Sequence, residues 1–183
     1  MGAHDGALLE ALIEYNPTPF QGEVWRITRK GLEPLRGSTA HGRWSAGADI
    51  EVLYTSLGRE GTLAEIGFRL GLEPAWPSRM EHEIHRLDVG VERALRLVDF
   101  KALEELGVDT LRYGGFDYTQ TKAIAAAAHF LEFDGLIVPS ARSKAQNLVL
   151  FKDRIKNLRL VTSESVDWAK WRKQLTQTTA SLI

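Results

Sequence analysis

The sequence contains no cysteine among its 183 residues. This absence excludes disulfide bonds, thiolate ligands for zinc and a cysteine nucleophile, and it fits a reducing compartment, which we expect to be the cytoplasm. The net charge is close to zero, because the sequence has 23 Lys and Arg and 24 Asp and Glu. We therefore expect no direct binding to nucleic acid or to an anionic membrane surface.

Long apolar runs are also absent. No segment reaches the roughly 18 consecutive apolar residues that span a bilayer. The first residues lack the basic start and the unbroken apolar stretch of a signal peptide. We therefore expect a soluble intracellular protein.

Several well-known catalytic motifs are missing. No G-x-G-x-x-G follows a strand, and there is no G-x-x-x-x-G-K-[ST], no H-E-x-x-H and no G-x-S-x-G around Ser140. His82 and His85 suggest a metal pair, but residues three apart on a strand face opposite sides of the sheet. We expect two half-exposed strand histidines and no metal site.

The composition is that of an ordinary globular domain with one core, with 44% hydrophobic and 26% charged residues. Helical and strand patterns mix without a regular βαβ rhythm, which favours an α+β fold built on a mixed β-sheet with flanking helices. The periodicity predicts strands at 22–28, 50–56, 81–89, 134–141 and 146–151, the last two as a hairpin. It predicts helices at 5–15, capped by Asp5, at 62–70, at 99–106, closed by Gly107, and at 119–133.

The chain divides into three expected parts: an N-terminal helix in residues 1–19, a central domain in 20–155 and a helical tail in 156–183. In this tail, Trp168, Trp171 and Leu175 fall on one helical face. Such a stripe packs against a core more often than it docks a partner.

Glu65 has a good structural explanation. Thr62 and Glu65 have the spacing of a capping box, in which the glutamate bonds back to the residue that begins the helix. Arg69 follows one turn later, which suits an ion pair worth about 0.2–0.5 kcal/mol. Spacing alone therefore favours a structural role for Glu65 over catalysis.

Two arginines are harder to explain structurally. Arg26 lies in the alternating strand 22–28, where burial is costly unless an anion pairs with it, although an edge strand with a solvated face is an equal alternative. Arg43 lies in a long glycine-rich loop, where a guanidinium can grip a phosphate through two hydrogen bonds. Ordinary structural roles account for the three other residues: Tyr54 is a strand-end aromatic, Ser140 a turn residue and Asn147 the start of a strand.

The order of these motifs resembles a known family. The series is similar to that of the RES-domain toxins: WR in a first strand, GRW in a glycine loop, YTS at a strand end, LAE in a helix, then PSA and a nearby asparagine. Those proteins are the toxin halves of bacterial toxin–antitoxin pairs, have an ADP-ribosyltransferase-like fold and act on NAD. The resemblance covers about residues 20–152.

The resemblance implies a role for each motif residue. Arg26 and Arg43 match the arginines that hold the NAD phosphates, Tyr54 matches the tyrosine beside the nicotinamide, and Glu65 matches the catalytic acid. A carboxylate beside the ribose stabilises the oxocarbenium-like state formed when the nicotinamide–ribose bond breaks.

Ser140 and Asn147 match a serine and an asparagine of the pocket wall. The chain departs from the family where the usual GRWN reads GRWS, so the resemblance does not carry over any contact made by that asparagine side chain.

The resemblance further implies a toxin that consumes NAD as substrate, with no bound cofactor, and a helix-turn-helix antitoxin of the Xre type that plugs the pocket. The sequence does not choose among water, phosphate and a protein side chain as acceptor. It also leaves open a protein ADP-ribosyltransferase, a non-catalytic interaction protein that docks through the Trp168 stripe, and homo-oligomers.

Overall fold

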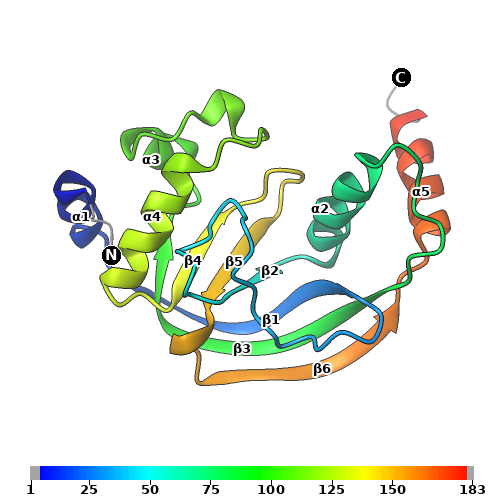
Figure 1. Ribbon diagram of the computed structural model, residues 1–183, viewed down its shortest axis with the longest axis horizontal. Helices are drawn as coiled ribbons and strands as arrows, with labels where there is room; N and C mark the ends of the chain where they lie inside the picture. Colours follow the sequence, from blue (N-terminus) through cyan, green and yellow to red (C-terminus); the bar gives the residue numbers. More distant parts are fainter. Residues whose placement is uncertain (1–4, 181–183) are drawn as a thin grey trace.

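The computed structural model describes residues 5–180 of the chain (Figure 1). Within this part of the chain, strands and helices alternate irregularly, as the sequence predicts. The elements are α1 (Gly6–Ile13), β1 (Thr18–Arg29), β2 (Val52–Ser56), α2 (Arg59–Gly71), β3 (His82–Arg96), α3 (Phe100–Glu105), η1 (Thr110–Arg112), α4 (Thr119–Phe130), β4 (Gly135–Pro139), β5 (Gln146–Phe151), η2 (Lys152–Arg154), β6 (Asn157–Ser165) and α5 (Trp168–Ala180).

The strands form one mixed sheet that curls back on itself. Its order is β1-β2-β5-β4-β3-β6, and β1 also pairs with β3, so that five strands close into a ring with β6 added at the outside of β3. The β3–β4 pair is parallel, whereas the other pairs are antiparallel. The predicted α+β fold with a mixed sheet is confirmed.

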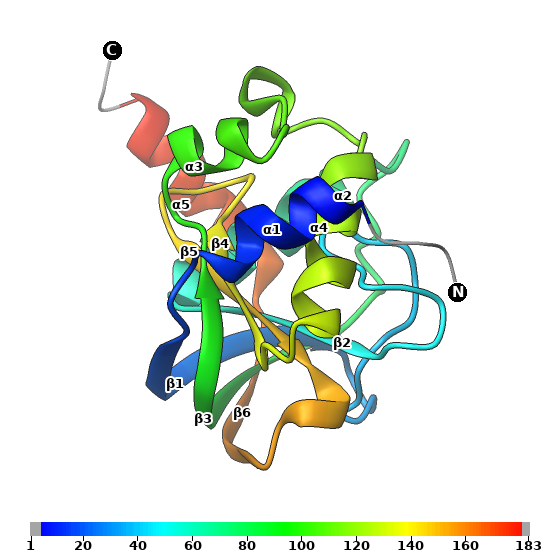
Figure 2. The ribbon, with the colours of Figure 1, turned by 90° about the vertical axis from the view of Figure 1, so that its left-hand side faces the viewer.

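Three apolar clusters hold the fold together. One fills the ring of strands with aliphatic side chains from β1 to β5, such as Val24, Leu87 and Leu148. A second lies between the sheet and α1, α3 and α4, and a third lies under α2 and α5. The helices therefore form two groups, with α1, α3 and α4 on the left of Figure 1 and α2 and α5 on the right; Figure 2 views the molecule from the side of the first group. No helix within residues 5–180 is long and apolar enough to cross a bilayer.

Several local predictions are confirmed. The Asp5 side chain accepts a hydrogen bond from the Ala7 N–H at 3.0 Å and so caps α1. Gly107 has a φ of 83° directly after α3, a left-handed conformation that glycine adopts without strain. β4 and β5 form the predicted hairpin.

The predicted helical tail is wrong for its first half. Residues 157–165 form β6, which pairs along β3, and helix begins only at Trp168. The residues of β6 are mostly exposed. An edge strand that is solvated on both faces has no clear apolar alternation for a sequence pattern to detect.

The prediction of two half-exposed histidines is also wrong. His82 and His85 are only 6% and 2% exposed, because α5 and β6 cover them. His82 Nδ1 accepts a hydrogen bond from Trp168 Nε1 at 3.1 Å, and His85 Nδ1 lies 2.8 Å from the Ser163 hydroxyl. Burial lowers the pKa of both imidazoles. The two rings contact different elements, as their spacing predicts.

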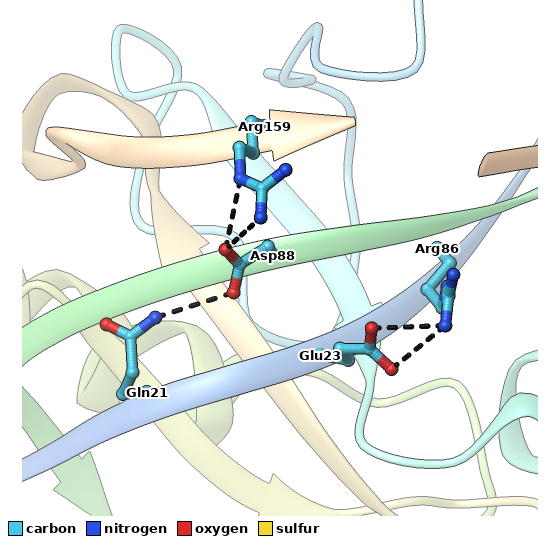
Figure 3. Close-up of polar contacts among 5 residues, drawn as sticks. All are labelled: Gln21, Glu23, Arg86, Asp88 and Arg159. Atoms are coloured by element: carbon cyan, nitrogen blue, oxygen red, sulfur yellow. Dashed lines mark hydrogen bonds and ion pairs between the residues drawn. The ribbon is translucent and has the colours of Figure 1, made fainter. Parts of the chain in front are cut away.

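Charged side chains pair across β1, β3 and β6 on the solvated surface of the sheet (Figure 3). Arg159 Nη2 lies 3.0 Å from the Asp88 carboxylate, and Arg86 Nη1 lies 3.1 Å from that of Glu23. Exposed pairs of this kind contribute about 0–1 kcal/mol each. The first pair joins β6 to β3 and the second joins β3 to β1, and neither lines the cleft described next.

Candidate active site

A cleft of about 330 Å³ opens between the ring of strands, α2 and three loops. Five of the six residues singled out in the sequence line it, and the sixth, Ser140, contacts one of the five. The five are Arg26 of β1, Arg43 of the loop before β2, Tyr54 of β2, Glu65 of α2 and Asn147 of β5.

Glu65 is held through one of its two carboxylate oxygens. Its Oε1 accepts hydrogen bonds from the Ser140 hydroxyl at 2.6 Å, the Ala141 N–H at 3.2 Å and the Asn147 side-chain amide at 3.3 Å. All three donors belong to the β4–β5 hairpin. The structure gives no such partner to Oε2 among the described residues, so this oxygen is free to face a ligand.

The two structural explanations for Glu65 are wrong. Helix α2 begins at Arg59 with Gly58 as its N-cap, so Thr62 lies inside the helix and cannot form a capping box with Glu65. The ion pair with Arg69 is not formed either, because the carboxylate bonds to the hairpin. The sequence did not indicate the true start of α2 because Gly61 lies in its first turns, and glycine is unfavourable inside helices. Glycine is needed at this position because a Cβ would collide with Ala145.

Arg43 is fixed by its surroundings before any ligand binds. Its Nη2 donates to the Gly115 carbonyl at 3.0 Å, and its guanidinium carbon lies 4.7 and 4.8 Å from the ring centres of Tyr113 and Tyr118. Burial raises the pKa of Tyr113 to about 12, so this ring stays neutral. The guanidinium is therefore held between two aromatic faces with part of its donor set free.

Tyr54 packs against the core and places its hydroxyl in the cleft wall. The hydroxyl accepts a hydrogen bond from the Trp44 N–H at 3.3 Å. Burial raises its pKa to about 12, so the phenol is protonated at neutral pH and can also donate. Gly42 makes this approach possible, because a Cβ there would overlap the phenol.

Arg26 is half-buried and lines the cleft without an anionic partner. Within residues 5–180 the structure gives its guanidinium no hydrogen bond or ion pair. Burial lowers its pKa to about 10. The solvated edge-strand alternative is wrong, because β1 pairs with β2 on one side and β3 on the other. A guanidinium in this setting is a site for an anion.

Helix α2 is itself clamped from behind by α5. Gly67 of α2 lies against the Trp171 ring so closely that a Cβ would overlap it. Trp171 in turn meets the Trp168 ring edge-on at 5.4 Å between ring centres. The predicted aromatic stripe of α5 is therefore packed inward at its two tryptophans, whereas Leu175 is 49% exposed.

Other cleft residues were missed by the sequence patterns. Tyr118 lines the cleft, and Tyr113 lies against Arg43. Both belong to a Tyr-Gly-Gly-Phe-Asp-Tyr segment, whose density of glycine and aromatic residues is the signal that could have identified it. Arg142 follows the Pro-Ser-Ala motif and lies over the Phe68 ring, 3.5 Å from its centre. These groups add one cation and several aromatic faces to the cleft.

The cleft is suited to an anionic ligand. Four arginines and one glutamate line it, and the described residues contain no group of three or more metal-ligating side chains. A single fixed carboxylate among cations and aromatic rings can stabilise a positively charged centre in a ligand whose other parts are negatively charged.

Comparisons with known proteins identify relatives of this chain. The model of the RES domain family matches residues 23–171. A Mycobacterium tuberculosis protein, Probable NAD(+) phosphorylase Rv3189, is 30% identical over 145 residues, which are 79% of this chain and 68% of that protein. NAD(+) phosphorylase MbcT of Mycobacterium bovis is 22% identical over 171 residues, which are 90% of this chain and 92% of MbcT.

A solved structure shares the fold. The crystal structure of the M. tuberculosis MbcT–MbcA toxin–antitoxin complex contains a chain that superposes with a TM-score of 0.81. The sequences are 20% identical, and the match covers 93% of this chain and 98% of that chain. Since the family model spans most of the sequence, the chain belongs to the RES domain family.

Proposed function

We propose that this RES-domain protein is a toxin that consumes NAD by transferring its ADP-ribosyl group from nicotinamide to inorganic phosphate. The phosphorylase names of two relatives support phosphate as the acceptor. The observation that carries the proposal is the carboxylate of Glu65, held through Oε1 alone in a cleft of arginines.

In this reaction the bond between the ribose C1′ and the nicotinamide nitrogen breaks, and its electron pair leaves with the now neutral nicotinamide. A phosphate oxygen forms the new bond to C1′, so nothing is oxidised or reduced. Positive charge develops on the ribose as the bond breaks, and Oε2 of Glu65 is the free anionic atom placed to stabilise it.

Arg26 and Arg43 bind the pyrophosphate of NAD. Arg26 offers a desolvated charge, and Arg43 offers a guanidinium already fixed by Gly115 and two tyrosine rings. Anchoring the dinucleotide at its non-reacting part positions the ribose against Glu65. Tyr54 lies beside the nicotinamide, and Ser140 and Asn147 act by holding the carboxylate.

The partner that we propose is a helix-turn-helix antitoxin of the Xre type. Support comes from the structural neighbour, which was solved as a toxin–antitoxin complex. A chain end with a free carboxylate suits the cationic cleft and would exclude NAD. Addition of the DNA-binding protein encoded beside this gene should then inhibit turnover competitively with NAD.

The test measures nicotinamide release from NAD with and without phosphate, and identifies the second product by mass spectrometry. Glu65→Gln keeps an oxygen that all three hairpin donors can reach but removes the charge, so we expect kcat to fall about 10²–10³-fold. Glu60→Gln is the matched control, since Glu60 is exposed on the same helix and pairs with Arg59.

Turnover of Glu65→Gln at the wild-type rate would contradict the proposal. Appearance of the ADP-ribosyl group on a protein, with little free product, would instead identify a protein ADP-ribosyltransferase. Absence of both NAD binding and turnover would identify an interaction protein that has kept the fold.

A further inference from the structure

Arg69 is a cation of the cleft that no neighbour engages. Arg43 bonds to a backbone carbonyl between two tyrosine rings, and Arg142 lies over the Phe68 ring. Arg69 also lines the cleft, yet within the described part of the chain the structure gives its guanidinium no hydrogen bond or ion pair. Its side chain is exposed at the cleft, where a soluble anion can reach it.

The position of Arg69 is set by the helix that carries Glu65. The two residues are four apart on α2, which places them on the same face with a rise of about 6 Å. The electrostatics agree: the pKa of Tyr54 is raised chiefly by burial, and among the groups that lower it Arg69 has a larger effect than Arg43. Arg69 therefore shares the α2 wall of the cleft with Glu65, and Tyr54 lines the same cleft.

We propose that Arg69 binds the inorganic phosphate that accepts the ADP-ribosyl group, an inference that rests on the proposed function. An acceptor anion must approach the ribose carbon that Glu65 faces, so the carboxylate repels it. A guanidinium one helical turn away offsets this repulsion and can donate two parallel hydrogen bonds to phosphate.

The charges of the cleft fit the assignment of Arg69 to the acceptor phosphate. The two phosphates of NAD match Arg26 and Arg43, and Arg142 lies over the Phe68 ring, so Arg69 is the cation assigned to the third anion. Attack by the phosphate dianion on C1′ expels neutral nicotinamide and leaves a singly charged phosphate ester that still carries its proton, so charge and atoms balance. Water as acceptor carries no charge and needs no such cation, so Arg69 favours phosphate over water.

The test varies phosphate at saturating NAD and separates ADP-ribose from ADP-ribose phosphorylated at this C1′ by chromatography. For Arg69→Gln we expect the KM for phosphate to rise about 10- to 100-fold, the range for loss of a charge-assisted contact. The share of hydrolysed product should rise, and the KM for NAD should stay within about twofold of wild type. Arg69→Lys should recover part of the phosphate affinity, because a point charge remains.

Arg59→Gln is the matched control, since it removes the same charge from the same helix at a residue that pairs with Glu60 and Glu164 outside the cleft. An unchanged KM for phosphate in Arg69→Gln overturns the inference while leaving the proposed function intact. An equal rise in the KM for NAD also overturns it, because Arg69 would then hold the dinucleotide. A wild-type protein that forms no phosphorylated product at any phosphate concentration refutes both proposals.

Discussion

Replacement of Arg26 by methionine should make the free protein more stable and at the same time abolish tight NAD binding. The guanidinium is half-buried and the structure gives it no anionic partner among the described residues. Its pKa is lowered by burial from 12.5 to about 10. The charged form is therefore disfavoured in the folded state, and binding of a phosphate relieves that penalty.

The magnitude follows from the pKa. A tenfold change in a protonation equilibrium is worth about 1.4 kcal/mol, so a pKa lowered from 12.5 to about 10 sets an upper limit of about 3–4 kcal/mol. Because Arg26 keeps some contact with water, we expect about 1–2 kcal/mol. The folded-state pKa lies below the unfolded value, so the penalty is fully present below pH 10 and is relieved only above it.

The assay is thermal unfolding with and without NAD. Arg26→Met should raise Tm by about 2–8 °C in the absence of ligand, given about 2–4 °C per kcal/mol for a chain of this size. NAD should raise the Tm of the wild type but not that of the variant. Arg29→Met is the control, since Arg29 is exposed at the end of the same strand. A variant less stable than wild type refutes the reasoning, because Arg26 would then have a stabilising partner in the free protein.

Two further substitutions test how the cleft is built. Gly42→Ala places a Cβ 2.9 Å from the Cζ atom of Tyr54. We therefore expect the free energy of unfolding, measured by urea denaturation, to fall by about 1–3 kcal/mol. Unchanged stability would mean that the loop moves freely. Ser140→Ala removes the shortest of three hydrogen bonds to Glu65. Because a hydrogen bond to a charged group is worth about 1.5–3 kcal/mol, we expect kcat to fall at least tenfold with little change in the KM for NAD. Lower stability with normal kcat would show a purely structural role.

The fold was predictable where the sequence carries a strong local signal. Asp5 caps α1, Gly107 ends the turn after α3, and the apolar strands β4 and β5 pair as a hairpin. The sequence did not reveal β6, because an exposed edge strand needs only backbone pairing with β3. The burial of His82 and His85 was missed for the same reason, since β6 and α5 are the elements that cover them.

The candidate site was predictable as a set of residues but not as a set of contacts. Motif order brought together Arg26, Arg43 and Tyr54, which all line one cleft. The two tyrosine rings that hold Arg43 come from a segment about 70 residues away, and only the three-dimensional structure brings them to the arginine. Sequence spacing cannot report a contact made across that separation.

Glu65 illustrates why helix spacing alone could not decide its role. If α2 had begun at Thr62, the carboxylate would have bonded to the helix end, and Arg69 would have been its nearest countercharge. Because α2 begins at Arg59, both residues lie within the helix and face the cleft. The hairpin takes one oxygen of Glu65 and leaves the other, together with Arg69, for ligands. The extra helical turn before Thr62, which the close packing at Gly61 permits, thus places Glu65 and Arg69 in the cleft and not at a helix end.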